Sequence, residues 1–162
     1  MVMNQNKLNL CFMNTARTFA SMSHCVRKKV GSVAVKDGNI VAIGWNGTPA
    51  GFDNCCEFQQ KTDNPEIPYI LVSKPEVLHA ESNVITKLAK STISSAGAII
   101  FITLSPCIEC AKLIIQSGIT EVYFEDKYKD ITGIKLLLQS GIHVYQLNNT
   151  KDDFNFLTKE DL

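Results

Sequence analysis

The chain has 162 residues, of which 45% are hydrophobic and 20% charged, and its 16 basic residues balance its 16 acidic ones. These values fit one soluble globular domain over residues 1–162. They argue against a protein that mainly grips a long nucleic acid, because such proteins usually carry a basic excess. The N-terminal stretch lacks the features of a signal peptide, and no apolar run approaches the roughly 18 residues that span a bilayer. We therefore expect a cytoplasmic protein without a membrane partner, whose cysteines serve as thiols and metal ligands rather than disulfides.

The first half of the chain predicts a helix, a hairpin and a long loop. Apolar residues at helical spacing indicate an amphipathic helix over residues 7–22. Two β-rich runs follow at residues 30–35 and 40–45, and the Asp37-Gly38 pair between them is a strong hairpin signal. Residues 48–77 are rich in proline and show no clear period, so we expect a long loop there.

The second half alternates helices and strands. A helix over residues 80–90 precedes the buried strand "GAIIFITL". Two similar units follow, "AKLIIQSGITEVYF" and "IKLLLQSGIHVYQL", each a helix ended by glycine and followed by a strand. Strands linked through such helices run parallel, with right-handed crossovers. The order predicts an α/β fold, a three-layer α/β/α sandwich around a five-stranded mixed sheet.

Two short motifs, "HAE" and "SPCIEC", indicate a metal site. Ser105 suits the N-cap of a helix whose first turn holds Cys107 and Cys110, where the helix dipole favours thiolates. His79 begins the preceding helix, and the helix-strand-helix order can bring both helix starts to one edge of the sheet. We therefore expect His79, Cys107 and Cys110 to bind one zinc ion. For the Cys-x-x-C pair taken alone, a buried apolar pair or a redox pair is the alternative.

The fourth zinc ligand is not evident in the chain. Cys11 falls on the apolar face of the first helix, where we expect core packing. The other candidates show no standard spacing to the three ligands: His24, Cys25, Cys55, Cys56 and His143. Three protein ligands and a water are typical of catalytic zinc, which activates that water. Glu81 can take the proton of the water and return it to a leaving group.

A His-x-Glu motif with a later Pro-Cys-x-x-Cys is the signature of zinc nucleobase deaminases. The chain resembles the cytidine deaminase-like superfamily, and most closely the deoxycytidylate (dCMP) deaminases. The resemblance is carried by "KVGSVAVKDGNIVAIGWNGTPAGFDNCCE", "HAESNVI", "TLSPCIECAKLIIQSGITEVYFEDKY" and "GIHVY". The metal motif marks only the superfamily, whereas Gly-x-Asn-Gly-x-Pro with Ser-Pro-Cys-x-x-Cys-Ala-Lys indicates the dCMP branch. The resemblance to dCMP deaminases implies attack of water on C4 of cytosine, release of ammonia, and formation of dUMP for thymidylate synthesis.

The resemblance also implies the roles of individual residues. It assigns zinc to His79, Cys107 and Cys110 and the proton shuttle to Glu81. Asn46 would contact the sugar, and the loop with Ser23 would reach the phosphate, although its two basic residues match no fixed family motif. The substrate-binding residues it implies are Ser23, Arg27, Lys28, Asn46, Ala80, Ser105 and Tyr128.

Relatives of this kind are commonly homo-hexamers that dCTP activates and dTTP inhibits. The resemblance places the effector site on the loop after the second strand, at Gly47, Thr48, Gly51, Phe52, Asp53 and Asn54. Mg²⁺ would accompany a nucleoside triphosphate there, with Asp53 as its ligand. Residues 57–78 contain no histidine or cysteine, which argues against the second, structural zinc that some relatives carry.

Two rival functions stay open. The first is another deaminase of the superfamily, acting on tRNA adenosine or on a free nucleobase; the neutral charge and the "GTPAGFDN" loop argue against a tRNA partner. The second is a non-catalytic domain that binds zinc or a nucleotide. Glu81 argues against that rival, because a structural site needs a fourth protein ligand and has no use for an acid at this position.

Overall fold

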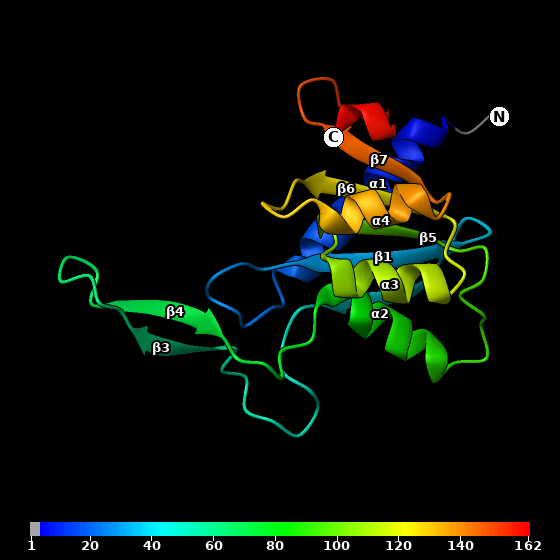
Figure 1. Cartoon of the computed structure of the whole chain (residues 1–162). Coiled ribbons are helices and arrows are strands. Elements are labelled where there is room, and N and C mark those ends of the chain that lie inside the picture. Colours follow the sequence, from blue (N-terminus) through cyan, green and yellow to red (C-terminus); the bar gives the residue numbers. More distant parts are fainter. Residues whose placement is uncertain (1–3) are drawn as a thin grey trace.

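The computed structural model describes residues 4–162 and has three layers, with α1 on one face of a central sheet and α2, α3 and α4 on the other (Figure 1). None of the described helices has the length and apolar character needed to cross a membrane. In chain order the elements are α1 (Gln5–Ala20), β1 (Gly31–Lys36), β2 (Asn39–Trp45), β3 (Glu57–Lys61), β4 (Tyr69–Ser73), α2 (Ala80–Ala89), β5 (Ile99–Leu104), α3 (Ile108–Gln116), β6 (Glu121–Asp126), α4 (Thr132–Gln139), β7 (His143–Asn148), β8 (Asp153–Leu157) and a final 3₁₀ turn (Lys159–Asp161).

The central sheet has the strand order β2-β1-β5-β6-β7-β8. β5, β6 and β7 run parallel as predicted, and β1 pairs antiparallel with both β2 and β5. Asp37 and Gly38 form the two-residue hairpin turn between β1 and β2, with φ values of 50° and 75° that a type I′ turn requires. The α/β/α sandwich and the mixed sheet are thus confirmed. The predicted number of strands is one too low, because β8 adds to the outer edge of β7.

Alternation along β5 divides the core into two halves. Ile100 and Ile102 face α2, α3 and α4, whereas Phe101 faces α1, and all three side chains are fully buried. Phe101 stacks on Tyr123 with ring centroids 4.7 Å apart and lies 5.4 Å from Phe12 of α1. β5 is therefore buried on both faces, as its continuous apolar sequence predicts.

The face that α1 turns to the sheet overlaps the predicted apolar face only in part. Its buried residues are Asn9, Phe12, Met13, Ala16 and Ala20. Cys11 is exposed, so the prediction that it packs in the core is wrong. The sequence pattern conceals the true face because it includes polar Asn9, whose side-chain oxygen accepts a hydrogen bond from Gln5 at 2.9 Å.

The segment predicted as a long loop contains a second, two-stranded sheet. β3 and β4 form an antiparallel hairpin that extends away from the central sheet (Figure 1). The ends of the segment are tied together, because Gly47 and Leu78 exchange two backbone hydrogen bonds of 3.0 and 2.9 Å. Several apolar side chains of the hairpin are exposed: Phe58, Ile67, Tyr69, Ile70 and Leu71.

Candidate active site

Two helix N-termini bring the predicted metal ligands together. His79 is the N-cap residue of α2, Cys107 is the N-cap of α3, and Cys110 lies in the first turn of α3. The Nδ1 atom of His79 lies 3.4 Å from the sulfur of Cys107 and 3.5 Å from that of Cys110. All three ligand atoms lie within 4.8 Å of one another, as a shared ion requires.

Ser105 does not cap α3 as predicted. Its hydroxyl instead accepts a hydrogen bond from the backbone N–H of Tyr128 at 2.8 Å, and its own N–H donates to Asp126. Ser105 therefore joins the end of β5 to the segment after β6. The helix begins after Cys107, which places the sulfur of that residue at the very start of the helix.

The donor set fits zinc in chemistry as well as in position. One imidazole and two thiols are ligands that Zn²⁺ prefers. A hydrogen bond with Cys110 lowers the pKa of Cys107 to about 3, which favours the thiolate form of Cys107. The same hydrogen bond raises the pKa of Cys110, and the hydrogen bond with Cys107 raises the pKa of His79. Zinc binding would therefore displace protons from this cluster.

Glu81 lies in the first turn of α2, and its side chain reaches the same pocket. It is 3% exposed, and burial raises the pKa of its carboxyl group to about 7. A carboxyl group with such a pKa can both accept and donate a proton near neutral pH.

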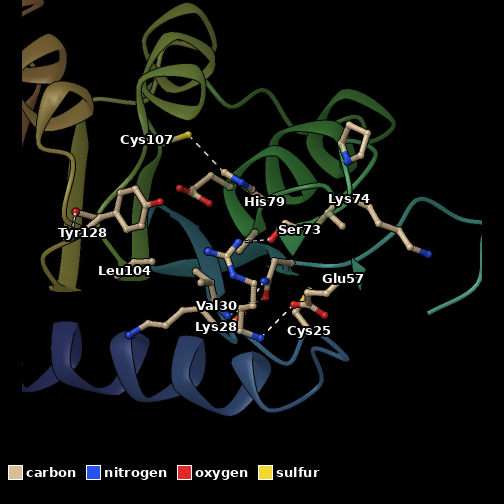
Figure 2. A pocket seen from close by; sticks show the side chains of 17 residues that line it. Cys25, Lys28, Val30, Glu57, Ser73, Lys74, His79, Leu104, Cys107 and Tyr128 are labelled. Atoms are coloured by element: carbon tan, nitrogen blue, oxygen red, sulfur yellow. Dashed lines mark hydrogen bonds between the residues drawn. The ribbon is translucent and has the colours of Figure 1, made fainter. Parts of the chain in front are cut away.

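A pocket of about 360 Å³ lies beside these residues (Figure 2). His79, Glu81 and Cys107 line one part of it, and the apolar side chains of Val30, Ala80 and Leu104 line its walls. Tyr128 lies at the side next to Leu104 (Figure 2). Such a pocket, with apolar walls and a few polar groups in one place, is typical of a site for a small molecule.

Basic side chains line another part of the pocket. Arg27 donates a hydrogen bond from Nη1 to the hydroxyl of Ser73 at 3.0 Å. Lys28 pairs with Asp126 at 3.3 Å, and Lys74 pairs with Asp53 at 3.4 Å. In Figure 2 these two lysine side chains extend to opposite sides of the pocket. Arg27 thus differs from Lys28 and Lys74, because its hydrogen-bond partner Ser73 lines the pocket whereas the partners of the two lysines do not.

Two of the predicted substrate-binding residues, Asn46 and Ser23, form hydrogen bonds with other parts of the chain. The Asn46 side chain accepts from Val30 N–H and donates to Lys28 C=O, both at 2.8 Å, and so holds the loop before β1. It still lines the pocket. Ser23 is 2% exposed and does not line the pocket, because its hydroxyl donates to the Asn46 carbonyl and accepts from Cys25 N–H. The structure therefore does not bring Ser23 to a position for phosphate contact.

The predicted effector residues lie in a turn beside the pocket and do not line it; those from Gly51 to Asn54 are exposed, whereas Gly47 and Thr48 are half-buried. Gly47 is paired with Leu78, the Thr48 hydroxyl donates to the Asp53 carbonyl, and Gly51 has a φ of 93°. Asp53 also accepts a hydrogen bond from Cys55 N–H, Phe52 is 59% exposed, and Asn54 is exposed as well. The Asp53–Lys74 ion pair joins this turn to a side chain of the pocket.

Sequence reasoning missed several features of the pocket. Glu57, Ser73 and Lys74 line it, and all come from the hairpin or its end. Cys25 and Cys56 form a disulfide, contrary to the prediction of free thiols, and so link the loop before β1 to the start of β3. The disulfide joins residues with a sequence separation of 31, so neighbouring residues along the chain gave no signal for it.

Comparisons with known proteins agree with the geometry. Residues 6–126 match the family described as "Cytidine and deoxycytidylate deaminase zinc-binding region". The deoxycytidylate deaminase of Enterobacteria phage T4 is 34% identical over 173 residues, covering 86% of this chain and 89% of the relative. That of Saccharomyces cerevisiae is 32% identical over 146 residues, covering 87% of this chain but 45% of the longer relative. The structure of dCMP deaminase from cyanophage S-TIM5 in complex with dCMP and dUMP superposes with a TM-score of 0.78 at 41% identity, covering 90% of this chain and 99% of that one.

Proposed function

Because this chain belongs to the cytidine and deoxycytidylate deaminase zinc-binding family, we propose that it deaminates dCMP to dUMP and ammonia. One observation carries the proposal. His79, Cys107 and Cys110 converge at a pocket that also holds the buried carboxyl group of Glu81 and, in another part, basic side chains. The product, dUMP, would be a precursor for thymidylate synthesis.

His79, Cys107 and Cys110 would hold the zinc ion. Zinc, when bound, supplies Lewis-acid activation of a water for attack on C4 of cytosine. Glu81 would take a proton from that water and later deliver one to the departing amino group, which leaves as ammonia. Burial raises the pKa of Glu81 to about 7 in the metal-free site, and the positive charge of zinc would lower it, which favours the carboxylate that accepts the first proton.

The rest of the pocket would bind and orient the nucleotide. Val30, Ala80, Leu104 and Tyr128 offer contact surface for the base and sugar and exclude water from the reacting atoms. Arg27 would bind the 5′-phosphate, with Lys28 and Lys74 adding positive charge nearby. A substrate without the phosphate would lose these contacts.

The experiment is a comparison of ammonia release from dCMP, dCTP, deoxycytidine and single-stranded DNA with the zinc-loaded protein. We expect dCMP to give the highest kcat/KM, and the variant Glu81→Gln to lose activity on every substrate. Equal kcat/KM for deoxycytidine and dCMP would refute the monophosphate assignment. Zinc binding without turnover of any of the four substrates would favour the non-catalytic rival.

We also propose that nucleoside triphosphates regulate the enzyme through the turn from Gly47 to Asn54. dCTP would activate and dTTP inhibit, with Mg²⁺ held at Asp53. The support is the Asp53–Lys74 pair, because a ligand that draws Asp53 to a cation would free Lys74 to face the substrate phosphate. Rate curves with dCMP should be sigmoidal and become hyperbolic with dCTP and Mg²⁺. Curves unaffected by either nucleotide would refute this, and light scattering would test the proposed hexamer.

A further inference from the structure

The base of the β3–β4 hairpin forms hydrogen bonds with Arg27, which is an exposed residue. Glu57 and Ser73 face each other as cross-strand partners at the first pair of the hairpin, where their side chains share one face. Both residues line the pocket, as does Arg27. The hairpin therefore contributes one pair of polar side chains to the pocket, while the rest of its length extends away from it (Figures 1 and 2).

Glu57 and Ser73 bind the same residue from two directions. One carboxylate oxygen of Glu57, which is 8% exposed, accepts hydrogen bonds from the backbone N–H groups of Val26 at 3.0 Å and Arg27 at 3.1 Å. The hydroxyl of Ser73 accepts from Arg27 Nη1 at 3.0 Å. Arg27 is thus held at its backbone by β3 and at its guanidinium by β4.

Further bonds hold the two segments together. The Cys25–Cys56 disulfide joins the residue before Val26 to the residue before Glu57, and Lys74 N–H donates to the Cys56 carbonyl at 2.8 Å. Glu57 therefore has little freedom to move away from the loop. A free arginine side chain must lose much rotamer entropy when it binds a ligand, and prior fixation of the side chain reduces that loss.

The charge of Glu57 shows which role it has. A carboxylate beside a phosphate site repels the phosphate, so Glu57 cannot contribute to phosphate binding by direct contact with the phosphate. Glu57 instead accepts hydrogen bonds from two consecutive N–H groups, and its negative charge strengthens these bonds, which fix the backbone at Val26 and Arg27.

We infer that Glu57 and Ser73 are positioning residues that set the preference for a 5′-monophosphate by fixing Arg27 in the pocket. The inference rests on the proposed function, in which Arg27 binds the phosphate of dCMP. It assigns the hairpin a part in substrate selection through its first residue pair.

The test measures the ratio of kcat/KM for dCMP to kcat/KM for deoxycytidine, which reports phosphate recognition alone. Glu57→Ala should lower this ratio about tenfold, mainly through the KM for dCMP, since two bonds to a charged group are lost. Ser73→Ala should lower it about two- to tenfold. Glu57→Gln and Ser73→Thr keep an acceptor oxygen and should restore most of the ratio. Glu66→Ala removes the same charge from the exposed tip of the hairpin and serves as the matched control.

A double-mutant cycle links the effect to Arg27. In an Arg27→Ala background, Glu57→Ala and Ser73→Ala should change the ratio no further. A constant ratio in both single variants, or an equal fall with and without Arg27, would overturn the inference. A lower KM for dCMP in Glu57→Ala would also overturn the inference, because it would show that Glu57 opposes binding of the phosphate. If Glu57→Ala does not fold, Ser73→Ala carries the test, and a wild-type protein without preference for dCMP would refute the proposed function itself.

Discussion

Substitution of Gly133 by alanine should damage the metal site from outside the pocket. Gly133 lies in the first turn of α4 and is buried against the segment that carries Cys107. A Cβ atom there would lie 2.1 Å from the carbonyl oxygen of Pro106 and 2.8 Å from the carbonyl carbon and oxygen of Cys107. Because these are backbone atoms, α4 and the Cys107 segment would have to separate by roughly 1 Å.

The cost can be estimated from two opposing effects. Overpacking of this kind costs about 1–3 kcal/mol, whereas glycine to alanine in a helix gains about 0.5–1 kcal/mol. A net loss of about 1–2 kcal/mol should lower the Tm by about 2–8 °C in a chain of this size. Displacement of a ligand that must be placed to within about 0.2 Å should weaken zinc binding about 10- to 100-fold.

Thermal unfolding with and without zinc, and zinc competition against a chelator, would measure both effects. Gly47→Ala is the control, because a Cβ at Gly47 has nothing within 4 Å. If Gly133→Ala binds zinc as tightly as the wild type and melts at the same or a higher temperature, the close-packing argument is wrong.

Three further predictions concern the metal and the proton shuttle. Glu81→Gln should keep zinc and the fold but lower kcat by about 10²–10⁴-fold, and loss of zinc from the folded variant by metal analysis would show that Glu81 is a ligand. Cys110→Ala should lose zinc and activity together while Cys11→Ala, at an exposed position, keeps both; full zinc in Cys110→Ala would contradict the ligand set. Burial raises the pKa of Glu81 to about 7, so at pH 6 the metal-free protein holds a proton there that a nearby cation would displace. Zinc binding at pH 6 should therefore release about one more proton from the wild type than from Glu81→Gln. Calorimetric titrations with zinc in two buffers would measure the number of protons released, and the difference between the two proteins should disappear by pH 8.

The sequence predicted those elements and site residues that are determined by periodicity, by glycine stops or by residue type. The units after residue 97 read correctly as helix and strand because each carries its own period and its own glycine stop at Gly118 or Gly141. His79, Cys107 and Cys110 could be grouped because zinc chemistry demands particular residue types, and the structure brings these three together.

Features that depend on distant partners could not be predicted in this way. β3 and β4 are short and largely exposed, so neither shows the alternation that marks a half-buried strand. The role of Glu57 depends on two backbone N–H groups, which every residue except proline carries and which leave no mark in the sequence. Asn9 is buried because Gln5 and the sheet surround it, a context that a polar residue in a helix pattern does not reveal.

The paired hydrogen bonds between Gly47 and Leu78 have a consequence for how this part of the chain can change during evolution. They close the segment of residues 48–77 at its base, directly before His79, so the position of that ligand does not depend on what lies farther out. The entropy of closing such a segment grows slowly, by about 0.6 kcal/mol for each doubling of its length. Insertions and deletions beyond the Glu57–Ser73 pair should therefore accumulate without displacing the catalytic centre, and this segment is where we expect homologous chains to differ most in length.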